Sequence, residues 1–205
     1  MELKACGDRA ILLDCADLDE ALAWHAALSP RVEAVLGART VLLRGEPAAL
    51  RSLLVETRPA ASDTARPSDQ AQPSDAVRIP VTYDGPDIAE VATLTGLTTA
   101  EVVAAHTGRP WTVAFAGFAP GFAYLTGGDP RLHVPRRDSP RSRVEPGAVG
   151  LAGEFSGVYP RASPGGWQLI GRTAVPLWDL DREPPALLTP GATVWFEPVQ
   201  SGEAR

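Results

Sequence analysis

The sequence predicts an α+β protein in which a small α/β-sandwich domain precedes a mostly β domain. Three observations support this fold class. The chain has 205 residues, of which 44% are hydrophobic and 21% charged, as in ordinary globular proteins. Helical and strand patterns alternate over residues 1–56, whereas short apolar runs between Pro-Gly pairs fill most of residues 77–200. Residues 57–76 contain no Val, Ile, Leu or aromatic residue and therefore read as a flexible or disordered linker.

The first domain is expected to combine strands with two helices. Asp17 and Glu20 have capping-box spacing and open a helix that runs to Ser29. Pro47 suits the first turn of a second helix, which ends near Glu56. Strand patterns with turns at Gly7 and Gly37 occupy residues 4–14, 32–36 and 40–43. This order predicts a small α+β sandwich.

The second domain is expected to begin with a strand at residues 77–81 and a short helix at residues 86–95. Thr98 and Glu101 form a second capping box, and Gly108 ends the helix that they open. Pro-Gly pairs suited to type II turns begin at Pro120, Pro146, Pro164 and Pro190. Plausible strands between them cover residues 111–118, 149–152, 167–170 and 193–196. Short strands with recurrent turns predict a β-barrel or a β-sandwich.

Charge and lysine content exclude several classes of function. The net charge is −6, so the chain lacks the overall positive field that nucleic-acid binding uses. Lys4 is the only lysine, which excludes a P-loop, Schiff-base or kinase-type lysine elsewhere in the chain. The apolar runs fall short of the roughly 20 residues of a membrane helix. The first residues show no secretory pattern, so we expect a cytoplasmic protein.

The two cysteines, Cys6 and Cys15, are expected to be small buried apolar residues with free thiols. They cannot form a structural zinc site, which needs four ligands. The sequence also contains no evident carboxylate pair for Mg²⁺, so we expect no metal site. Signatures of the common hydrolases and dinucleotide enzymes are missing from the sequence as well.

An aromatic stretch at residues 115–125 is the first of three candidate functional clusters. Its rings alternate with small residues around a tight Pro120-Gly121 turn, through which a backbone or ligand can approach closely. Phe115 and Phe118 read equally well as members of a barrel core. For the turn, together with Phe122 and Tyr124, we favour recognition.

Arginines and a glycine-rich segment supply the other two clusters. Five arginines lie in a short proline-rich loop, at positions Arg131, Arg136, Arg137, Arg141 and Arg143. They could bind a carboxylate or phosphate, Arg136 and Arg137 above all, or form ordinary surface pairs. In the third cluster Gly165 and Gly166 precede Trp167 and Gln168, which point to opposite faces of a strand, and Arg172 follows at its end.

The three histidines have different expected roles. His25 lies on a helix and reads as structural. His106 lies in the last turn of its helix, where an interaction with the helix dipole competes with a catalytic role. His133, within the arginine loop, is the better acid–base candidate, although no partner is visible for it. His106 and His133 are therefore the candidate catalytic residues.

Several ordered motifs resemble those of the 5-oxoprolinase B-subunit family, also called allophanate hydrolase subunit 1 or the carboxyltransferase subdomain family. The family motif Gly-Phe-x-Pro-Gly-Phe-x-Tyr corresponds to Gly117 to Tyr124. Many members carry glutamine and proline where this chain has Ala119 and Ala123, so any amide contact from that glutamine is lost. The motifs that carry the resemblance lie at residues 115–125, 135–137, 146–150, 157–160 and 164–173, with weaker ones at 7–10, 79–83 and 101–106.

The resemblance implies a cyclophilin-like β-barrel for the second domain and a small α+β first domain. It also implies a role in opening 5-oxo-L-proline to L-glutamate with ATP hydrolysis, with ATP as a co-substrate, beside the C and A subunits of that enzyme. Because no complete catalytic constellation is visible, we expect the chain to supply part of a shared site and to be inert alone. Two alternatives stay open: a regulatory protein that inhibits a histidine kinase, as in some family members, and a subunit of an allophanate- or urea-related amidohydrolase.

Overall fold

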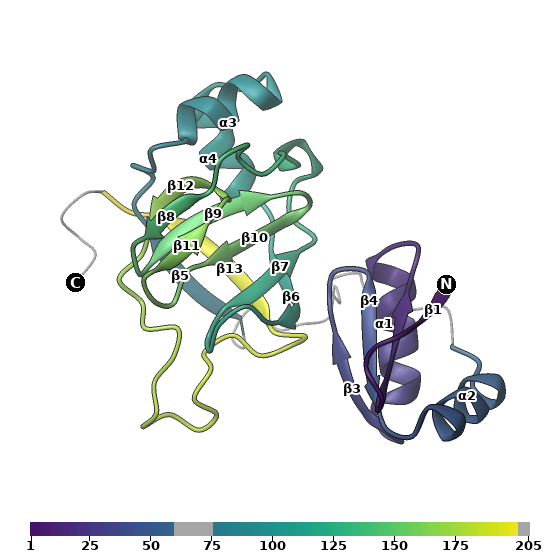
Figure 1. Ribbon diagram of the computed structural model, residues 1–205. Coiled ribbons are helices and arrows are strands. Elements are labelled where there is room, and N and C mark those ends of the chain that lie inside the picture. The colour runs from purple at the N-terminus through teal and green to yellow at the C-terminus, as the bar shows by residue number, and fades with distance from the viewer. Residues whose placement is uncertain (60–75, 201–205) are drawn as a thin grey trace. The chain divides into compact units, whose positions relative to one another are not determined.

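The computed structural model describes residues 1–59 and 76–200 and shows a mixed α/β protein (Figure 1). Its contacts divide the chain into two compact units, Met1–Arg66 and Pro67–Arg205. The predicted linker at residues 57–76 lies almost entirely outside the described residues. Each unit is built around a sheet and a core of its own.

The first unit is a four-stranded antiparallel sheet in the order β1-β2-β4-β3, with α1 packed against β3 and β4 and α2 against β2. Alternate residues of the two central strands, such as Ile11 and Leu13, enter one core together with Trp24 of α1 and Leu54 of α2. The two helices therefore cover the same face of the sheet. The elements of this unit are β1 (Glu2–Ala5), β2 (Ala10–Asp14), α1 (Leu18–Leu28), β3 (Glu33–Leu36), β4 (Thr40–Arg44) and α2 (Pro47–Glu56).

Local signals in the sequence position both helices of this unit. Asp17 caps α1 by accepting a 2.8 Å hydrogen bond from the backbone N–H of Glu20. The carboxylate of Glu20 accepts from the N–H of Ala16 rather than from that of the capping residue, so the predicted capping box is shifted by one residue. Pro47 begins α2, as its fixed φ favours.

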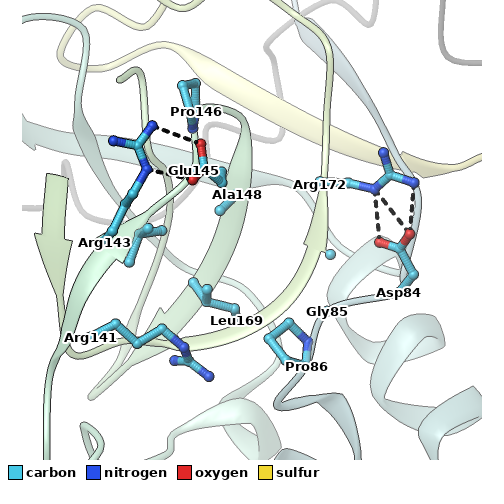
Figure 2. A pocket seen from close by; sticks show the side chains of 12 residues that line it. Asp84, Gly85, Pro86, Arg141, Arg143, Glu145, Pro146, Ala148, Leu169 and Arg172 are labelled. Carbon is cyan, nitrogen blue, oxygen red and sulfur yellow. Dashed lines mark hydrogen bonds and ion pairs between the residues drawn. The ribbon is translucent and has the colours of Figure 1, made fainter. Parts of the chain in front are cut away.

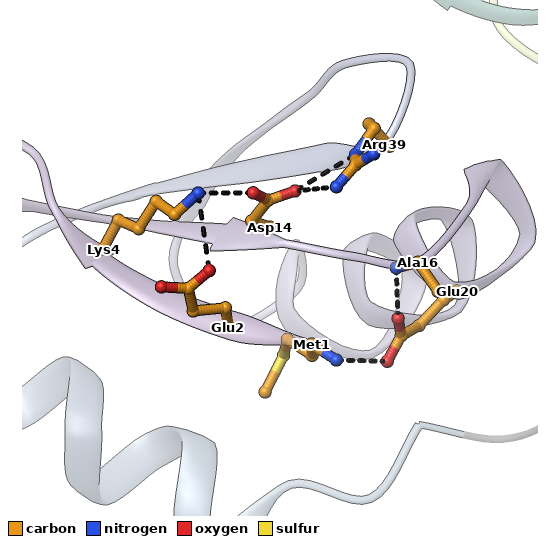
Figure 3. A network of polar contacts seen from close by, with 7 residues as sticks. All are labelled: Met1, Glu2, Lys4, Asp14, Ala16, Glu20 and Arg39. Carbon is orange, nitrogen blue, oxygen red and sulfur yellow. Dashed lines mark hydrogen bonds and ion pairs between the residues drawn. The ribbon is translucent and has the colours of Figure 1, made fainter.

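Asp14 joins three segments of the first unit by ion pairs (Figure 3). Its carboxylate accepts a 2.5 Å hydrogen bond from Lys4 on β1 and a 2.8 Å hydrogen bond from Arg39, which precedes β4. These donors, Lys4 first, lower the pKa of Asp14. All three groups reach solvent, so each pair contributes little stability, and their main effect is to orient the first strand on its neighbour.

The cysteines only partly follow the prediction. Both are free thiols, but only Cys15 is buried; Cys6 is exposed in the turn between β1 and β2, and the expectation that both are buried is wrong for it. Burial raises the pKa of the Cys15 thiol.

The second unit is built around a seven-stranded sheet in the order β12-β9-β10-β7-β6-β13-β5, which curves into a nearly closed barrel. Thr82, just after β5, and Arg172, at the end of β12, exchange two backbone hydrogen bonds of 2.9 Å that join the outer strands. The parallel pair β13 and β5 is the one exception to the antiparallel pairing of this described sheet. The strands of the seven-stranded sheet are β5 (Val77–Val81), β6 (Trp111–Ala116), β7 (Ala123–Thr126), β9 (Ala148–Ala152), β10 (Phe155–Val158), β12 (Gln168–Arg172) and β13 (Thr193–Pro198).

Two helices lie at one end of the barrel, α3 (Ile88–Thr95) against β12 and α4 (Thr99–Thr107) against β13 (Figure 1). Thr98 and Glu101 form the predicted capping box completely, with both reciprocal hydrogen bonds present. Within the described residues no single helix is long and apolar enough to cross a membrane; α3 and α4 reach that length only together and are bent by 89° at their break.

A short ribbon of β8 (Arg141–Val144) and β11 (Ser163–Gly165) covers the outer face of the barrel (Figure 1). Residues alternate along the barrel strands: Ile170 of β12 enters the barrel core, whereas Leu169 enters a second core with Val144 of the ribbon. This second core supports the residues of the candidate site.

Four strands of the second unit were not predicted, namely β7, β8, β10 and β11. Three of the four Pro-Gly pairs have the predicted positive φ at glycine, as at Gly121 with 82°. Gly165 does not, because Pro164-Gly165 lies in β11 instead of in a turn, and the turn prediction there is wrong. The predicted strand 111–118 ends at Ala116, and the residues after it form a tight loop.

Candidate functional site: an aromatic pocket and an arginine groove

A small pocket of about 110 Å³ gathers residues from all three sequence clusters. These residues converge at one edge of the ribbon, where four segments meet. The segments are the loop before β7, the loop before the ribbon, the end of β10 and the β11–β12 connection. We call this hollow the aromatic pocket. It is lined by Phe118, Phe122, Tyr124, Arg136, Tyr159, Pro164, Gly165, Gly166 and Trp167, six of which are predicted site residues.

Phe122 organises the aromatic side of the pocket. Its ring meets those of Tyr124, Tyr159 and Trp167 edge to face, with centroids 5.1, 5.4 and 5.4 Å apart. Tyr124 is in turn stacked on Phe115 at 4.3 Å. Each such ring pair adds roughly 0.5–1.5 kcal/mol beyond the area that it buries, so the walls are largely pre-formed.

Phe118 is a pocket residue that the sequence analysis placed in a strand. It has φ +66°, and the N–H of Ala119 donates a 2.7 Å hydrogen bond to the carbonyl of Gly117. Phe118 is thus the centre of a γ-turn with positive φ, a rare and strained conformation for a residue with a side chain. Phe118 is 58% exposed, and its ring meets those of Phe122 and Tyr159 edge to face at the pocket. Strain of this kind clusters at binding sites.

The Pro120-Gly121 turn shapes the loop without lining the pocket. Gly121 has φ +82°, and a Cβ there would lie 2.9 Å from the Cβ of Trp178. Glycine is therefore required both by the backbone and by this close approach. Pro120 is exposed.

Arg136 supplies the only charged side chain of the pocket lining. It makes no ion pair with any carboxylate in the described part of the chain, unlike its neighbour Arg137. The hydroxyl-bearing rings of Tyr124 and Tyr159 line the same pocket, and burial raises the pKa of both. The pocket thus offers flat apolar walls, two neutral hydroxyl groups and one unpaired cation.

Arg137 is held in a cluster around Asp87, which is only 3% exposed. The carboxylate of Asp87 accepts hydrogen bonds from Arg137 Nη1 at 2.8 Å, Arg141 Nη2 at 2.6 Å and the N–H of Leu169 at 2.7 Å. The N–H of Arg137 also donates to the carbonyl of Gly166, at 2.8 Å. Arg137 therefore fastens its loop to the barrel and does not line the aromatic pocket. No sequence motif pointed to Asp87.

A second hollow of about 330 Å³, which we call the arginine groove, lies at the β8 edge of the ribbon (Figure 2). Arg172 pairs there with Asp84 at 2.8 Å, and Arg143 pairs with Glu145 at 2.7 Å. These carboxylates raise the pKa of both guanidinium groups. The arginine groove is lined by Asp84, Gly85, Pro86, Arg141, Arg143, Val144, Glu145, Pro146, Ala148, Leu169, Gly171 and Arg172.

The side chains of Trp167 and Gln168 lie in different surroundings, as predicted for neighbours that point to opposite faces of a strand. Both residues are buried. Trp167 lines the aromatic pocket, whereas the amide nitrogen of Gln168 donates to the carbonyl of Pro135 at 3.3 Å. The amide oxygen of Gln168 has no partner among the described residues. Gln168 lines neither hollow.

His106 lies inside the barrel core with no exposed surface. Its Nδ1 is 2.7 Å from the hydroxyl of Tyr83 and its Nε2 is 2.9 Å from that of Ser156. Burial lowers the pKa of His106 to about 3, so the ring is neutral and the predicted charge–dipole interaction is absent. This position gives His106 no access to a substrate. His133 is exposed after a short 3₁₀ helix, η3 (Pro130–Leu132), and lines neither hollow. His25 lies partly buried on α1.

Both units fall within one known domain class. Residues 1–188 match the family model described as carboxyltransferase domain, subdomain C and D, so the chain belongs to this family. The resemblance found in the sequence motifs is thereby confirmed.

The most similar relatives among those compared carry a narrower name than the family does. Over 129 residues the chain is 48% identical to the 5-oxoprolinase B subunit of Escherichia coli O157:H7, a match that covers 62% of this chain and 59% of that protein. It is 46% identical over 123 residues to the 5-oxoprolinase B subunit of Bacillus subtilis strain 168, with 58% and 51% covered. The matches thus span only about half the length of these relatives.

Solved structures show the same fold. TTHA0988 matches with a TM-score of 0.69 and 33% identity, over 94% of this chain and 41% of that one. PH0987 from Pyrococcus horikoshii matches with a TM-score of 0.62 and 30% identity over the whole of both chains. The Kluyveromyces lactis urea carboxylase has a TM-score of 0.71 over 98% of this chain and 22% of its own, and at 20% identity it indicates the fold alone.

Proposed function

We propose that this chain is the B subunit of an ATP-dependent 5-oxoprolinase, which opens 5-oxo-L-proline to L-glutamate with ATP hydrolysis in the cytoplasm. In this proposal it acts together with the C and A subunits of the enzyme. The relatives named as 5-oxoprolinase B subunits support the assignment, at 43–48% identity. The observation in the structure that favours it most is that Arg136 and several flat aromatic rings line the same small pocket.

The chemistry of the aromatic pocket suits 5-oxoproline, which has a small planar lactam and one carboxylate. Arg136 can bind a carboxylate by a bidentate, charge-assisted pair, and no described carboxylate occupies it already. The rings of Phe122, Tyr124 and Trp167 can pack on the flat lactam. Pockets for drug-sized ligands have roughly 300–1,000 Å³, so 110 Å³ admits a compact ring and not a nucleotide.

In the part of the chain that the structure describes, the aromatic pocket offers binding groups and no suitably placed acid–base group. His106 is enclosed and neutral, and His133 lines neither hollow. Tyrosine is protonated at neutral pH, and burial raises the pKa of Tyr124 and Tyr159 further, so neither hydroxyl can act as a base. Opening an unactivated lactam requires activation of its amide oxygen, for which phosphorylation by ATP is suited, and positioning of a water molecule. We therefore assign these steps to groups that the partner subunits supply, and we expect the isolated chain to be inert.

The test is an assay of 5-oxoproline-dependent ATP hydrolysis by the chain purified with and without its partner subunits. We expect turnover only in the complex, and a loss of about tenfold or more in kcat/KM for Arg136→Gln, the size expected for a lost charge-assisted hydrogen bond. Arg109→Gln, also at an exposed arginine but outside both hollows, is the matched control and should keep full activity. Turnover by the chain alone would contradict the shared site. Hydrolysis driven by urea or allophanate and not by 5-oxoproline would contradict the substrate.

A further inference from the structure

We propose that Gln168 is a positioning residue that sets the specificity of the aromatic pocket, because it fixes the gap between Arg136 and Trp167. That gap decides how far a ligand's carboxylate can lie from its flat ring. The inference rests on the proposed function and deepens it, since it says which feature of a lactam acid the pocket selects. Gln168 lines neither hollow, so it acts through its neighbours.

Two hydrogen bonds join the loop before the ribbon to the β11–β12 connection. The amide nitrogen of Gln168 donates to the carbonyl of Pro135 at 3.3 Å. The N–H of Arg137 donates in the opposite direction, to the carbonyl of Gly166 at 2.8 Å. In each segment the two bonded residues are separated by a single residue, so the two bonds form a bracket that fixes the spacing of the segments.

The residues enclosed by this bracket are Arg136 in one segment and Trp167 in the other, and both line the aromatic pocket. Burial raises the pKa of the Tyr124 and Tyr159 hydroxyls, and the charge of Arg136 opposes that rise, so the guanidinium group lies near both rings. Trp167 is only 5% exposed and forms a fixed wall. The bracket therefore sets the distance between the cation that can hold a carboxylate and a ring on which a lactam can pack.

The bracket is anchored to the barrel. Gln168 is the first residue of β12 and pairs with Leu151 of β9. The buried carboxylate of Asp87 accepts from Arg137 Nη1 at 2.8 Å and from the N–H of Leu169 at 2.7 Å, so it ties the same two segments together once more. The backbone on both sides of the gap is thus held before a ligand arrives, and little ordering is needed on binding.

The surroundings of Gln168 indicate a role other than stability. Gln168 is 4% exposed, and its amide oxygen has no hydrogen-bond partner among the described residues. A buried polar atom without a partner destabilises the folded state. An apolar side chain of similar length avoids that cost, so the fold does not require glutamine at this position. What glutamine supplies is the donor that holds the carbonyl of Pro135.

A fixed gap selects a ligand by the distance between its carboxylate and its ring. In 5-oxoproline the carboxylate is attached directly to the lactam ring. Its homologue (5-oxopyrrolidin-2-yl)acetate has one more CH₂ between the two groups, so it cannot pack on Trp167 and pair with Arg136 equally well. A site built to bind a polar group discriminates strongly against a ligand that leaves that group badly paired.

The experiment measures ATP hydrolysis driven by 5-oxoproline and by this homologue, in the complex of the chain with its partner subunits. The wild type should prefer 5-oxoproline by about tenfold or more in kcat/KM. Gln168→Met keeps the length of the side chain and removes the donor. It should raise the KM for 5-oxoproline about fivefold and weaken the preference, with kcat and Tm unchanged. Gln200→Met, the same change at an exposed residue outside both hollows, is the matched control and should behave as wild type.

A double-mutant cycle shows whether Gln168 acts through Arg136. In an Arg136→Gln background, Gln168→Met should not raise the KM further, because the cation to be positioned is gone. Additive effects would overturn the proposal, as would an unchanged KM and preference in Gln168→Met or a fall in its Tm with equal losses on both substrates. These outcomes leave the proposed function standing. A wild-type complex that does not hydrolyse ATP in response to 5-oxoproline would overturn both.

Discussion

Tyr83 and His106 meet inside the barrel, with the tyrosine hydroxyl 2.7 Å from Nδ1 of the histidine. Ser156 completes the arrangement at Nε2, at 2.9 Å, and Phe196 stacks on the imidazole at 4.3 Å. A buried imidazole with both nitrogens hydrogen-bonded is stable only while it is neutral.

Acid should destabilise the protein through His106. Its pKa is about 3 in the folded state and 6.5 ordinarily, so the unfolded chain binds the extra proton as the pH falls below 6.5. The contribution of His106 to the free energy of unfolding is therefore complete above pH 6.5 and is lost as the pH falls towards 3. The loss is ~1.4 kcal/mol per pH unit once the histidine of the unfolded chain is protonated. Urea unfolding of wild type and His106→Gln at pH 7.5, 6.5 and 5.5 measures this. The variant should be less stable at pH 7.5, and its free energy of unfolding should change less with pH. An equal pH dependence of the two proteins would show that His106 is not the group responsible.

Asp87 is expected to be the carboxylate on which the second unit depends most. Asp87→Asn removes the charge from a nearly buried site and leaves Arg137 and Arg141 facing each other. Breaking a buried pair in this way costs roughly 3–5 kcal/mol. Asp84→Asn removes an exposed partner of Arg172 and should cost at most about 1 kcal/mol. Chemical denaturation of both variants checks the contrast, which fails if the two losses are equal.

The loop at Phe118 should show strain that a pair of substitutions can reveal. Phe118→Ala and Phe118→Gly both remove the ring, but only glycine adopts φ +66° without cost. The left-handed region costs other residues roughly 1–2 kcal/mol, so the glycine variant should be more stable than the alanine variant by about 1 kcal/mol. If the aromatic pocket holds 5-oxoproline as we propose, both variants should bind it more weakly than wild type, because a pocket wall is lost. A more stable alanine variant would show that the turn is unstrained.

Two adjacent glycines of the aromatic pocket should respond differently to alanine. A Cβ at Gly165 would lie 2.4 Å from the hydroxyl of Tyr159, whereas at Gly166 the nearest atom, Cβ of Pro140, is 3.6 Å away. Gly165→Ala must displace a buried ring, at a cost of roughly 1–3 kcal/mol. Gly166→Ala should be close to wild type in stability. Melting temperatures of the two variants compare them directly, and equal values would contradict the packing.

Local signals explain why much of the fold was predictable. The capping box at Thr98 and Glu101, the proline at the start of α2 and the positive φ of Gly121 are set by neighbouring residues. The ribbon strand β8 was missed because its sequence, Arg-Ser-Arg-Val, has no apolar alternation, and tertiary packing on the barrel decides its conformation.

The candidate site was predictable only as separate segments. Phe122, Arg136 and Trp167 were singled out, but their meeting in one pocket depends on the pairing of β7 with β10 and of β8 with β11, which join segments far apart in the sequence. Asp87 could not be found, since a single carboxylate near a helix start gives no sign of partners 50 and 54 residues away. His106 has the spacing of an ordinary helix end, and only the closed barrel shows that it is enclosed.

The backbone bridge between Thr82 and Arg172 also bears on self-association. An unpaired strand edge is a template for other chains, and the bridge joins the two outer strands of the barrel sheet where such edges would otherwise lie. In the first unit, β1 and β3 remain as sheet edges, and their exposed positions carry the charges of Glu2, Lys4 and Glu33 beside the apolar Leu3 and Val35. Charges on an edge discourage strand addition, so the barrel sheet is protected by its closing bridge, whereas the first sheet depends on the charges that flank its exposed apolar side chains.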